Sequence, residues 1–314
     1  MNLLKLKKYE PIYVIGHSNI DIDSAISSKI LCDILNSLGI ESYYAILEEK
    51  YNFDEYNKKM LDDCIDFKPV IIKKKDVNKY NWILVDHNDK SQSVGHDANV
   101  ILSIDHHPNA GNVKNVLLTD ICSTALYIYK LFKDTYSFNE EQKHQIYMAF
   151  LNDSTFTLTS RYKESDGILA SELGFSTDYK KLFKKYFIPT NISKGIKVQL
   201  YNGHKKYKFK NVYFESGYIE QFGTKKLSEY KKLIKNTDSF LGIWVDYENL
   251  HTYAFFNFDN KFKEFDYNFI ASRATTILND VIEYLVENQY LSRWEIWIVY
   301  IQKYWNLKEN LKKQ

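Results

Sequence analysis

The sequence is poor in cysteine, and its three cysteines form no recognisable framework. Cys32, Cys64 and Cys122 are an odd number, and no two of them have C-x-x-C spacing. This argues against a disulfide-stabilised fold and against a zinc finger. Free cysteines fit a reducing compartment, so we expect a cytoplasmic protein.

The sequence also lacks a long apolar run and an excess of charge of one sign. No window approaches the roughly 18 apolar residues of a membrane span, and residues 1–11 (MNLLKLKKYEP) do not resemble a signal peptide. The 42 basic residues nearly balance the 40 acidic ones, for a net charge of +2. We therefore expect neither a membrane nor a nucleic-acid polymer as partner.

The first half of the chain alternates short apolar segments with helical patterns. The expected strands are residues 12–16, 42–47, 70–72, 82–85 and 100–104. The expected helices are residues 24–38, 53–64, 123–133, 140–151, 165–173 and 179–186. This alternation predicts an α/β fold whose first domain is a doubly wound, mainly parallel sheet with helices on both faces.

A break around Pro189 separates this pattern from a different one. We place the first domain at residues 1–188, a linker at 189–193 and a smaller second domain at 194–314. The second domain is expected to be α/β with a mixed sheet. Its expected strands are 208–219, 240–256 and 295–301, and its expected helices are 224–234 and 270–287.

Four clusters of His and Asp lie at strand ends or helix ends of the first domain. They are residues 16–24 (GHSNIDIDS), 85–89 (VDHND), 104–108 (IDHHP) and 151–155 (LNDST). Taken singly, an Asp in such a place is as readily a helix cap or turn residue, and a lone His a structural residue. Together they suggest one site, because the carboxyl ends of parallel strands meet at one sheet edge.

Metal ions give the best account of so many carboxylates at one edge. Burying them unpaired would cost several kcal/mol each, and the clusters contain almost no Lys or Arg that could compensate. Carboxylate oxygens suit Mg²⁺ and Mn²⁺, and imidazole shifts the preference toward Mn²⁺ or Co²⁺. We expect two divalent ions, Mn²⁺ foremost, with Co²⁺ and Mg²⁺ as alternatives.

The ordered set of clusters resembles the motifs of the DHH phosphoesterase superfamily, and within it the family II, manganese-dependent inorganic pyrophosphatases. The first motif of that family is similar to G-H-x-N-P-D-T-D-S, with Ile20 and Ile22 here in place of Pro and Thr. The resemblance covers most of residues 12–175. Exopolyphosphatases of the superfamily are near relatives but typically lack a histidine at the position of His17.

The resemblance implies a role for each matching residue. One metal would be held by His17 and Asp21, a second by Asp23, His106 and Asp153, with Asp86 bridging both. His107 would contact the substrate near the leaving group, and Asp105 would orient a histidine. The implied substrate contacts are Asn88, Gln92, Arg293 and Lys205 or Lys206.

The implied reaction is hydrolysis of a phosphoanhydride by two-metal activation of water. The substrate would be a small phosphate compound, inorganic pyrophosphate or short polyphosphate. Two alternatives stay open. The chain could cleave a phosphodiester in a small nucleotide, or it could be a catalytically weakened relative that binds metal and has an interaction role. A homodimer also stays open. One departure bears on the substrate, because two lysines of the family's S-R-K-K-Q signature are replaced by Trp294 and Glu295.

Overall fold

The chain forms two compact units, residues 1–179 and 180–314. The computed structural model describes residues 3–48, 52–53, 55–155, 157, 162–182, 185–186, 196, 200, 204–209, 211–271 and 273–292. The expected linker, residues 189–193, lies outside these ranges, so the expected boundary remains a prediction.

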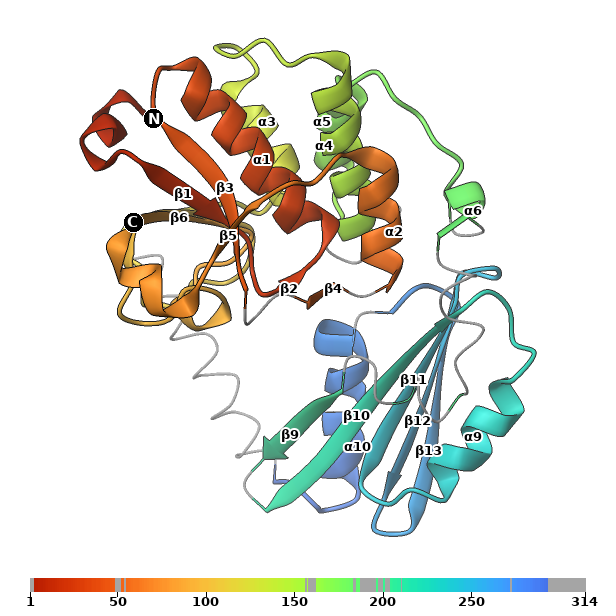
Figure 1. Ribbon diagram of the computed structural model, residues 1–314. Helices are drawn as coiled ribbons and strands as arrows, with labels where there is room; N and C mark the ends of the chain where they lie inside the picture. Colours follow the sequence, from red (N-terminus) through yellow and green to blue (C-terminus); the bar gives the residue numbers. More distant parts are fainter. Residues whose placement is uncertain are drawn as a thin grey trace. The chain divides into compact units, whose positions relative to one another are not determined.

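The first unit is built on a six-stranded, all-parallel sheet (Figure 1). The strand order is β5-β3-β1-β6-β7-β8. The strands are β1 (Ile12–Ile15), β3 (Ser42–Leu47), β5 (Val70–Ile72), β6 (Asn81–Val85), β7 (Asn99–Asp105) and β8 (Val116–Leu118). From β1 the chain passes to β3 and β5 on one side and then to β6 on the other. This reversal places a crevice at the carboxyl ends of β1 and β6, and it confirms the expected fold class.

The α-helices of the first unit gather on one face of this sheet (Figure 1). They are α1 (Ile22–Ser37), α2 (Glu55–Cys64), α3 (Thr124–Phe132), α4 (Glu140–Asp153) and α5 (Glu164–Ser171), and the short α6 (Tyr179–Leu182) follows near the unit boundary. The helix α1 begins at Asp21, whose side chain forms a capping box with Ser24, and it buries Ile26, Ile30 and Ile34 at helical spacing. Among the described residues no helix has the length and apolarity needed to cross a membrane.

In the part of the first unit that the structure describes, short 3₁₀ turns and loops cover the other face of the sheet, and no α-helix lies there. Trp82 and Leu84 of β6 pack there with Val77 of η2 (Lys74–Lys79) and with Val94 and Val113. Helices were expected on both faces, but the segment between β6 and β7 leaves room only for the single turn η3 (Lys90–Gln92). A 3₁₀ helix η1 (Leu3–Tyr9) precedes β1, and a two-stranded pair, β2 (Asn19–Ile20) with β4 (Asn52–Phe53), completes the unit.

The second unit has a mixed five-stranded sheet of order β13-β12-β11-β10-β9. The strands are β9 (Lys205–Phe209), β10 (Val212–Gln221), β11 (Phe240–Asp246), β12 (His251–Phe258) and β13 (Lys261–Tyr267). Only β10 and β11 among these strand pairs run parallel. The helices are α9 (Leu227–Lys235), a π-helical turn η5 (Arg273–Ile277) and α10 (Leu278–Glu287).

Three expectations for the second unit were wrong in detail. The strand expected at 240–256 is two antiparallel strands, β11 and β12, joined by a turn. The strand expected at 208–219 is likewise two antiparallel strands, β9 and β10, because the chain turns back so that Phe209 pairs with Val212. The helix expected at 270–287 begins with the π turn at Arg273 and becomes α-helical only at Leu278. The strand β13 was not anticipated, and the strand expected at 295–301 lies outside the described residues.

Candidate metal centre

Three neighbouring strands deliver the central side chains of the site. His17 follows β1, Asp86 follows β6 and His106 follows β7, and these strands are adjacent in the sheet. Asp86 has a φ of 61°, which lies in the left-handed region where Asp and Asn are the most tolerated non-glycine residues. The turn directs its carboxylate back across the strand ends toward both histidines.

The first group of possible ligands is His17, Asp21 and Asp86, whose ligand atoms all lie within 4.8 Å of one another. Nε2 of His17 is 3.3 Å from Oδ2 of Asp21 and 3.2 Å from Oδ2 of Asp86. Asp21 also caps α1, since its Oδ1 accepts a hydrogen bond from the Ser24 amide at 2.9 Å. The capping role and a ligand role therefore use different oxygens of one carboxylate.

The second group is Asp23, Asp86, His106 and Asp153, again within 4.8 Å of one another. Nε2 of His106 is 3.2 Å from Oδ1 of Asp86 and 3.1 Å from Oδ2 of Asp153, which ends α4. This nitrogen is buried, and among the described residues it has no hydrogen-bond partner of acceptable geometry. Asp86 belongs to both groups and offers one oxygen to each histidine.

The electrostatics of the site indicate missing positive charge. Burial would lower the pKa of His106, but the carboxylates of Asp153 and Asp86 raise it to about 11. Burial would likewise lower the pKa of His17, but the carboxylates of Asp21 and Asp86 outweigh this effect and raise it to about 11. The protein on its own thus draws protons to both imidazoles. Two divalent cations would match the four ionised carboxylates with neutral histidines, so the donor set and the orphaned His106 nitrogen fit such ions.

The amino-terminal end of α3 holds Asp23. The carboxylate of Asp23 accepts hydrogen bonds from the Ser123 hydroxyl at 2.8 Å and from the amides of Thr124 at 2.6 Å and Ala125 at 2.9 Å. Burial, together with Asp153 and Asp86, raises the pKa of Asp23, and these three donors oppose that rise by favouring the charged form.

Ser123 and Thr124 were not singled out from the sequence. The hydroxyl of Thr124 donates to Oδ1 of Asp86 at 3.1 Å, so one residue contacts both Asp23 and Asp86. The available signal was a Ser-Thr pair at the start of an expected helix, which is too common at helix caps to point to a metal centre.

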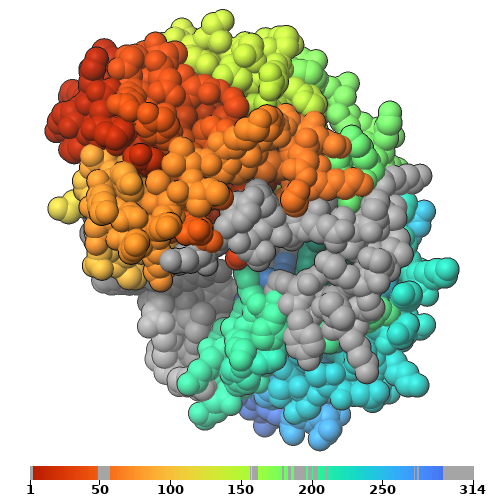
Figure 2. Space-filling model, in the orientation of Figure 1, coloured from red at the N-terminus to blue at the C-terminus, as the bar shows by residue number. Residues whose placement is uncertain are grey.

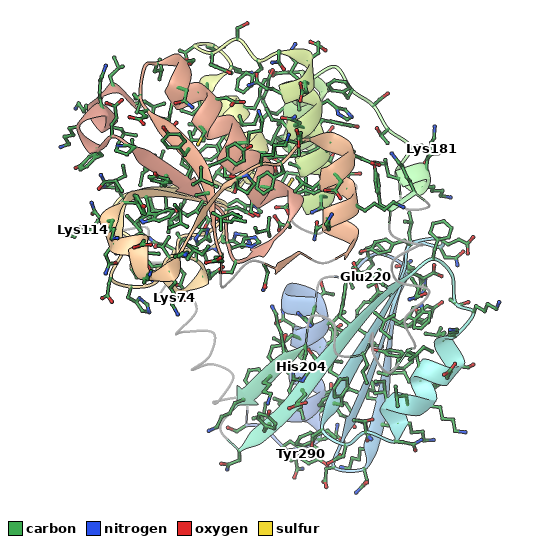
Figure 3. The ribbon with its side chains drawn as sticks, viewed as in Figure 1. Lys74, Lys114, Lys181, His204, Glu220 and Tyr290 are labelled. Atoms are coloured by element: carbon green, nitrogen blue, oxygen red, sulfur yellow. The ribbon has the colours of Figure 1, made fainter. Side chains whose placement is uncertain are left out.

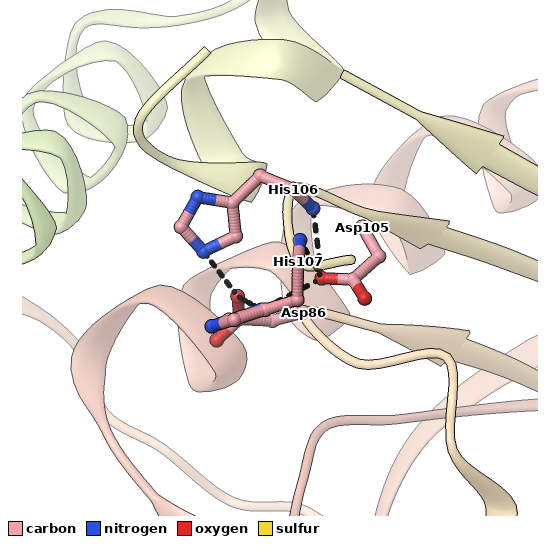
Figure 4. A group of neighbouring side chains, drawn as sticks. All are labelled: Asp86, Asp105, His106 and His107. Atoms are coloured by element: carbon pink, nitrogen blue, oxygen red, sulfur yellow. Dashed lines mark hydrogen bonds and ion pairs between the residues drawn. The ribbon is translucent and has the colours of Figure 1, made fainter. Parts of the chain in front are cut away.

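Asp105 organises the turn that carries both histidines (Figure 4). Its Oδ1 accepts from the amides of His106 and His107, at 2.7 and 3.0 Å, and lies 2.9 Å from Nδ1 of His107. Burial raises the pKa of Asp105, but the hydrogen bonds from His107 outweigh it and lower the pKa below its ordinary value. The His107 side chain is 44% exposed, so its ring is held at one nitrogen and open to solvent.

Asn88 is engaged within the protein. It is 2% exposed. Its amide nitrogen donates to Oδ2 of Asp105 and to the Pro108 carbonyl, and its amide oxygen accepts from the Ala110 amide. These contacts join the loop after β6 to the loop after β7. Substrate contact by Asn88 remains a prediction. In the structure its side chain holds Asp105 and the loop after β7 in position.

Comparison with known proteins agrees with this geometry. Residues 11–152 match the DHH family, N-terminal domain. Among solved structures, the chain is similar to a candidate family II inorganic pyrophosphatase of Methanococcus jannaschii at 19% identity and a TM-score of 0.63, covering 85% of this chain and 97% of that one. An exopolyphosphatase-related protein of Bacteroides fragilis matches at 14% identity and a TM-score of 0.48, covering 80% and 81%. None of the curated protein sequences compared matches this chain.

The first unit contains every predicted metal ligand, and all of these ligands except Asp153 fall within the residues that match the DHH family. The predicted substrate residues are more scattered. Gln92 lies in the DHH domain beside His17, in a hollow of about 360 Å³ that Ser18, Asn19 and Ser91 also line. Lys205 and Lys206 lie on β9 of the second unit, and Arg293 lies outside the described residues. Family, fold and acidic cluster together support a phosphoesterase-type hydrolase.

Proposed function

We propose that this chain is a metal-dependent phosphoanhydride hydrolase that acts on inorganic pyrophosphate or short polyphosphate. Three groups of possible ligands share Asp86, and the third consists of Asp86, Asp105, His106 and His107. The observation that carries the proposal is that two of them, one with His17 and Asp21 and one with Asp23, His106 and Asp153, have only Asp86 in common. One carboxylate that serves two groups is the arrangement expected of a two-ion site for phosphoryl transfer. The match of residues 11–152 to the DHH family adds independent support.

The residues are assigned as follows. One ion would be held by His17 and Asp21 and the other by Asp23, His106 and Asp153, with Asp86 contributing to both. Mn²⁺ is favoured because the set mixes imidazole with carboxylate. Bound divalent ions supply Lewis-acid chemistry, which polarises phosphoryl oxygens and lowers the pKa of water.

The chain's own polar groups then orient the substrate. Nδ1 of His107 is held by Asp105, which fixes the ring and leaves Nε2 directed to the exposed side of the turn. Nε2 of His107 can therefore hydrogen-bond the leaving-group side of a phosphoanhydride and donate a proton there. Asn88 keeps Asp105 in place, and Gln92 borders the hollow next to His17.

The second unit is proposed to supply cations for the remaining phosphate oxygens, with Arg293 and either Lys205 or Lys206 as candidates. Two family lysines are absent at Trp294 and Glu295. Loss of one charge-assisted hydrogen bond costs about 1.5–3 kcal/mol, roughly 10- to 150-fold in binding. We therefore expect weak or slow pyrophosphatase activity and tolerance of longer or less charged phosphates.

The test is release of phosphate from pyrophosphate, triphosphate, long polyphosphate and a cyclic dinucleotide, each with Mn²⁺, Co²⁺ and Mg²⁺. We expect turnover of pyrophosphate or short polyphosphate with Mn²⁺, and none after chelation. Adding Trp294→Lys with Glu295→Lys should raise pyrophosphate turnover. Cleavage of the cyclic dinucleotide alone would replace the proposal with a phosphodiesterase, and no turnover of any compound would refute it.

Asp86→Asn is the sharpest single-residue test of the shared ligand. Asn keeps the shape and tolerates the left-handed backbone at this position, so the variant should fold while losing a ligand from both groups. We expect loss of activity beyond the about 10- to 100-fold typical of residues that only orient a ligand. Metal content of the purified variant should fall below two ions per chain, whereas the exposed control Asp97→Asn should keep both.

A further inference from the structure

The loop after β6 folds back on itself around the side chain of His87. This side chain is 1% exposed, and its Nδ1 lies 2.9 Å from the Val85 carbonyl oxygen, while its Nε2 lies 2.6 Å from Oγ of Ser93. A carbonyl oxygen only accepts, so Nδ1 carries a proton, and in a neutral ring Nε2 accepts from the Ser93 hydroxyl. The ring therefore ties the start of the loop, at the end of β6, to its far end.

The middle of this loop is a compact turn. It is capped by Asp89, whose Oδ1 accepts from the Ser91 amide at 2.9 Å and from Nδ2 of Asn112 at 2.7 Å. Oδ1 of Asn112 accepts in turn from the Lys90 amide at 3.1 Å, and Lys114, two residues further on, is labelled at the edge of the first unit in Figure 3. The loop forms part of the orange surface of the first unit in Figure 2. These contacts fix the shape of the turn.

This turn holds the loop that carries His17. The amide of Ser18 donates to the Gln92 carbonyl at 2.8 Å, and the Ser18 hydroxyl donates to the same oxygen. The rings of His17 and His87 meet edge to face, with 6.3 Å between their centres. His17, Ser18 and Ser93 also line one cavity. The position of His17 thus depends on the turn, and the turn is tied down by the contact between His87 and Ser93.

The second ligand group is supported by other elements. The hydroxyl of Ser123 and two amides at the start of α3 hold Asp23. The carboxylate of Asp105 accepts from the amide of His106 at 2.7 Å. The two groups therefore rest on different contacts, although they share Asp86.

We infer that His87 and Ser93 are positioning residues for His17, and through it for only one of the two ion sites. The other site, formed by the second ligand group, depends on Ser123 and the start of α3. The inference rests on the metal centre of the proposed function and not on its substrate. It predicts two ion affinities that can be changed one at a time.

Titration of the metal-free, full-length chain with Mn²⁺, followed by calorimetry, measures both affinities. The matched variants are Ser93→Ala and Ser123→Ala, each of which removes one buried hydroxyl. We expect Ser93→Ala to weaken one ion about 10- to 100-fold, as for other residues that orient ligands, and to leave the other unchanged. Ser123→Ala should weaken the other ion, and the double variant should weaken both.

A His17→Ala background identifies which ion is affected. This variant should bind one ion, at the second group. Adding Ser93→Ala should leave the affinity for that ion unchanged, whereas adding Ser123→Ala should lower it. Two variants of His87 give a further check. His87→Gln can place an amide oxygen near the position of Nε2 and accept from Ser93, so it should bind the first ion more tightly than the shorter His87→Asn.

Several outcomes would overturn the inference. They are equal losses at both ions in folded Ser93→Ala, no loss at either ion, or a further loss when Ser93→Ala is added to His17→Ala. Thermal unfolding without metal verifies folding, and if the His87 variants fail to fold, the serine variants decide.

The same titration separates the inference from the proposed function. Fewer than two Mn²⁺ ions bound by the wild type would reject the two-ion centre, and the proposed function with it. Two bound ions without hydrolysis of any phosphate compound would reject the proposed function and leave the inference standing. Two bound ions that respond equally to Ser93→Ala would reject the inference alone.

Discussion

At the residue scale, Asp86 is the point on which the candidate centre depends. Its carboxylate faces His17 and His106 at 3.2 Å each and accepts the Thr124 hydroxyl at 3.1 Å. Burial alone would raise the pKa of Asp86, but hydrogen bonds from the two histidines hold it well below its usual range. A buried carboxylate that stays ionised against its surroundings is a strong ligand for a cation.

Thr124→Val should weaken metal binding while keeping the shape of the site. The change replaces a hydroxyl that donates to Asp86 with a methyl group, and leaves the amide that donates to Asp23 intact. We expect Mn²⁺ affinity to fall about 10- to 100-fold, as for other residues that orient ligands. Titration calorimetry measures the change, and Thr124→Ser, which keeps the hydroxyl, should lie near wild type. Equal affinities of all three proteins would contradict this role.

As a candidate substrate contact, Lys205 gives phosphate binding a pH dependence. Because its pKa lies below the ordinary 10.5, its charge is present at neutral pH and is lost earlier than usual as pH rises. Pyrophosphate affinity of the metal-free protein should therefore decline on the alkaline side, at a lower pH than for a lysine of ordinary pKa. Lys205→Arg remains charged throughout and should keep its affinity to higher pH. Identical profiles of the two proteins would argue against Lys205 as a contact.

The sequence predicted the ligands better than the residues that support them. An Asp or His directly after an apolar strand identifies a strand end, so His17, Asp86 and His106 could be found without knowing the strand order. The contacts of Asn88 could not be predicted in this way, because they depend on which loops lie next to each other in the folded unit. Likewise Lys205 and Lys206 differ only through the register of β9, and the expected strand began three residues too late.

At the scale of elements, close packing of α9 on the second sheet depends on a residue without a side chain. A Cβ added at Gly242 of β11 would lie 2.5 Å from Cδ1 of Ile234 and 2.9 Å from the hydroxyl oxygen of Tyr230. Both residues are fully buried with Trp244 and Phe255 in the core of this unit. The helix can thus approach the strand directly.

Gly242→Ala should destabilise the second unit by about 1–3 kcal/mol through overpacking. Urea unfolding monitored by tryptophan fluorescence measures the loss, and the exposed helix variant Ser228→Ala serves as control. Mn²⁺ content should stay at the wild-type value, because the candidate ligands all lie in the first unit. A variant as stable as wild type would mean that α9 shifts to admit the methyl group.

The prediction of strands failed where one continuous alternating pattern runs through a turn of the chain. Residues 208–219 alternate as one strand would, and only the pairing of Phe209 with Val212 reveals the turn between β9 and β10. The strands β2 and β4 are each two residues long, and β8 has three residues. Such strands are too short to show the alternation of apolar and polar residues that would predict them. Longer elements such as α1 and α4 were predicted well because their caps and apolar periodicity agree.

At the scale of the whole molecule, the candidate metal ligands all lie in the first of the two units, whereas some of the proposed substrate contacts lie in the second. A protein truncated after residue 188 should fold, keep two Mn²⁺ ions and show thermal stabilisation by Mn²⁺, about 2.7 kcal/mol at 100 times the dissociation constant. It should lose hydrolysis, because the proposed substrate contacts of the second unit, Arg293 with Lys205 or Lys206, are absent. Metal analysis and phosphate release test both halves of the prediction. Full activity of the truncated protein would show that residues 189–314 are dispensable.

The order of strands also bears on how the protein is made. The central pair of the first sheet joins Ile12 to Asn81, and the candidate ligands run from His17 to Asp153. A chain emerging from the ribosome therefore exposes His17, Asp21 and Asp23 long before the last ligand has been synthesised. Non-local parallel pairing is slow to form. If the protein binds metal as proposed, loading would therefore follow synthesis of nearly the whole first unit. Until then the nascent chain exposes unpaired strand edges, and these are prone to aggregation unless a chaperone covers them.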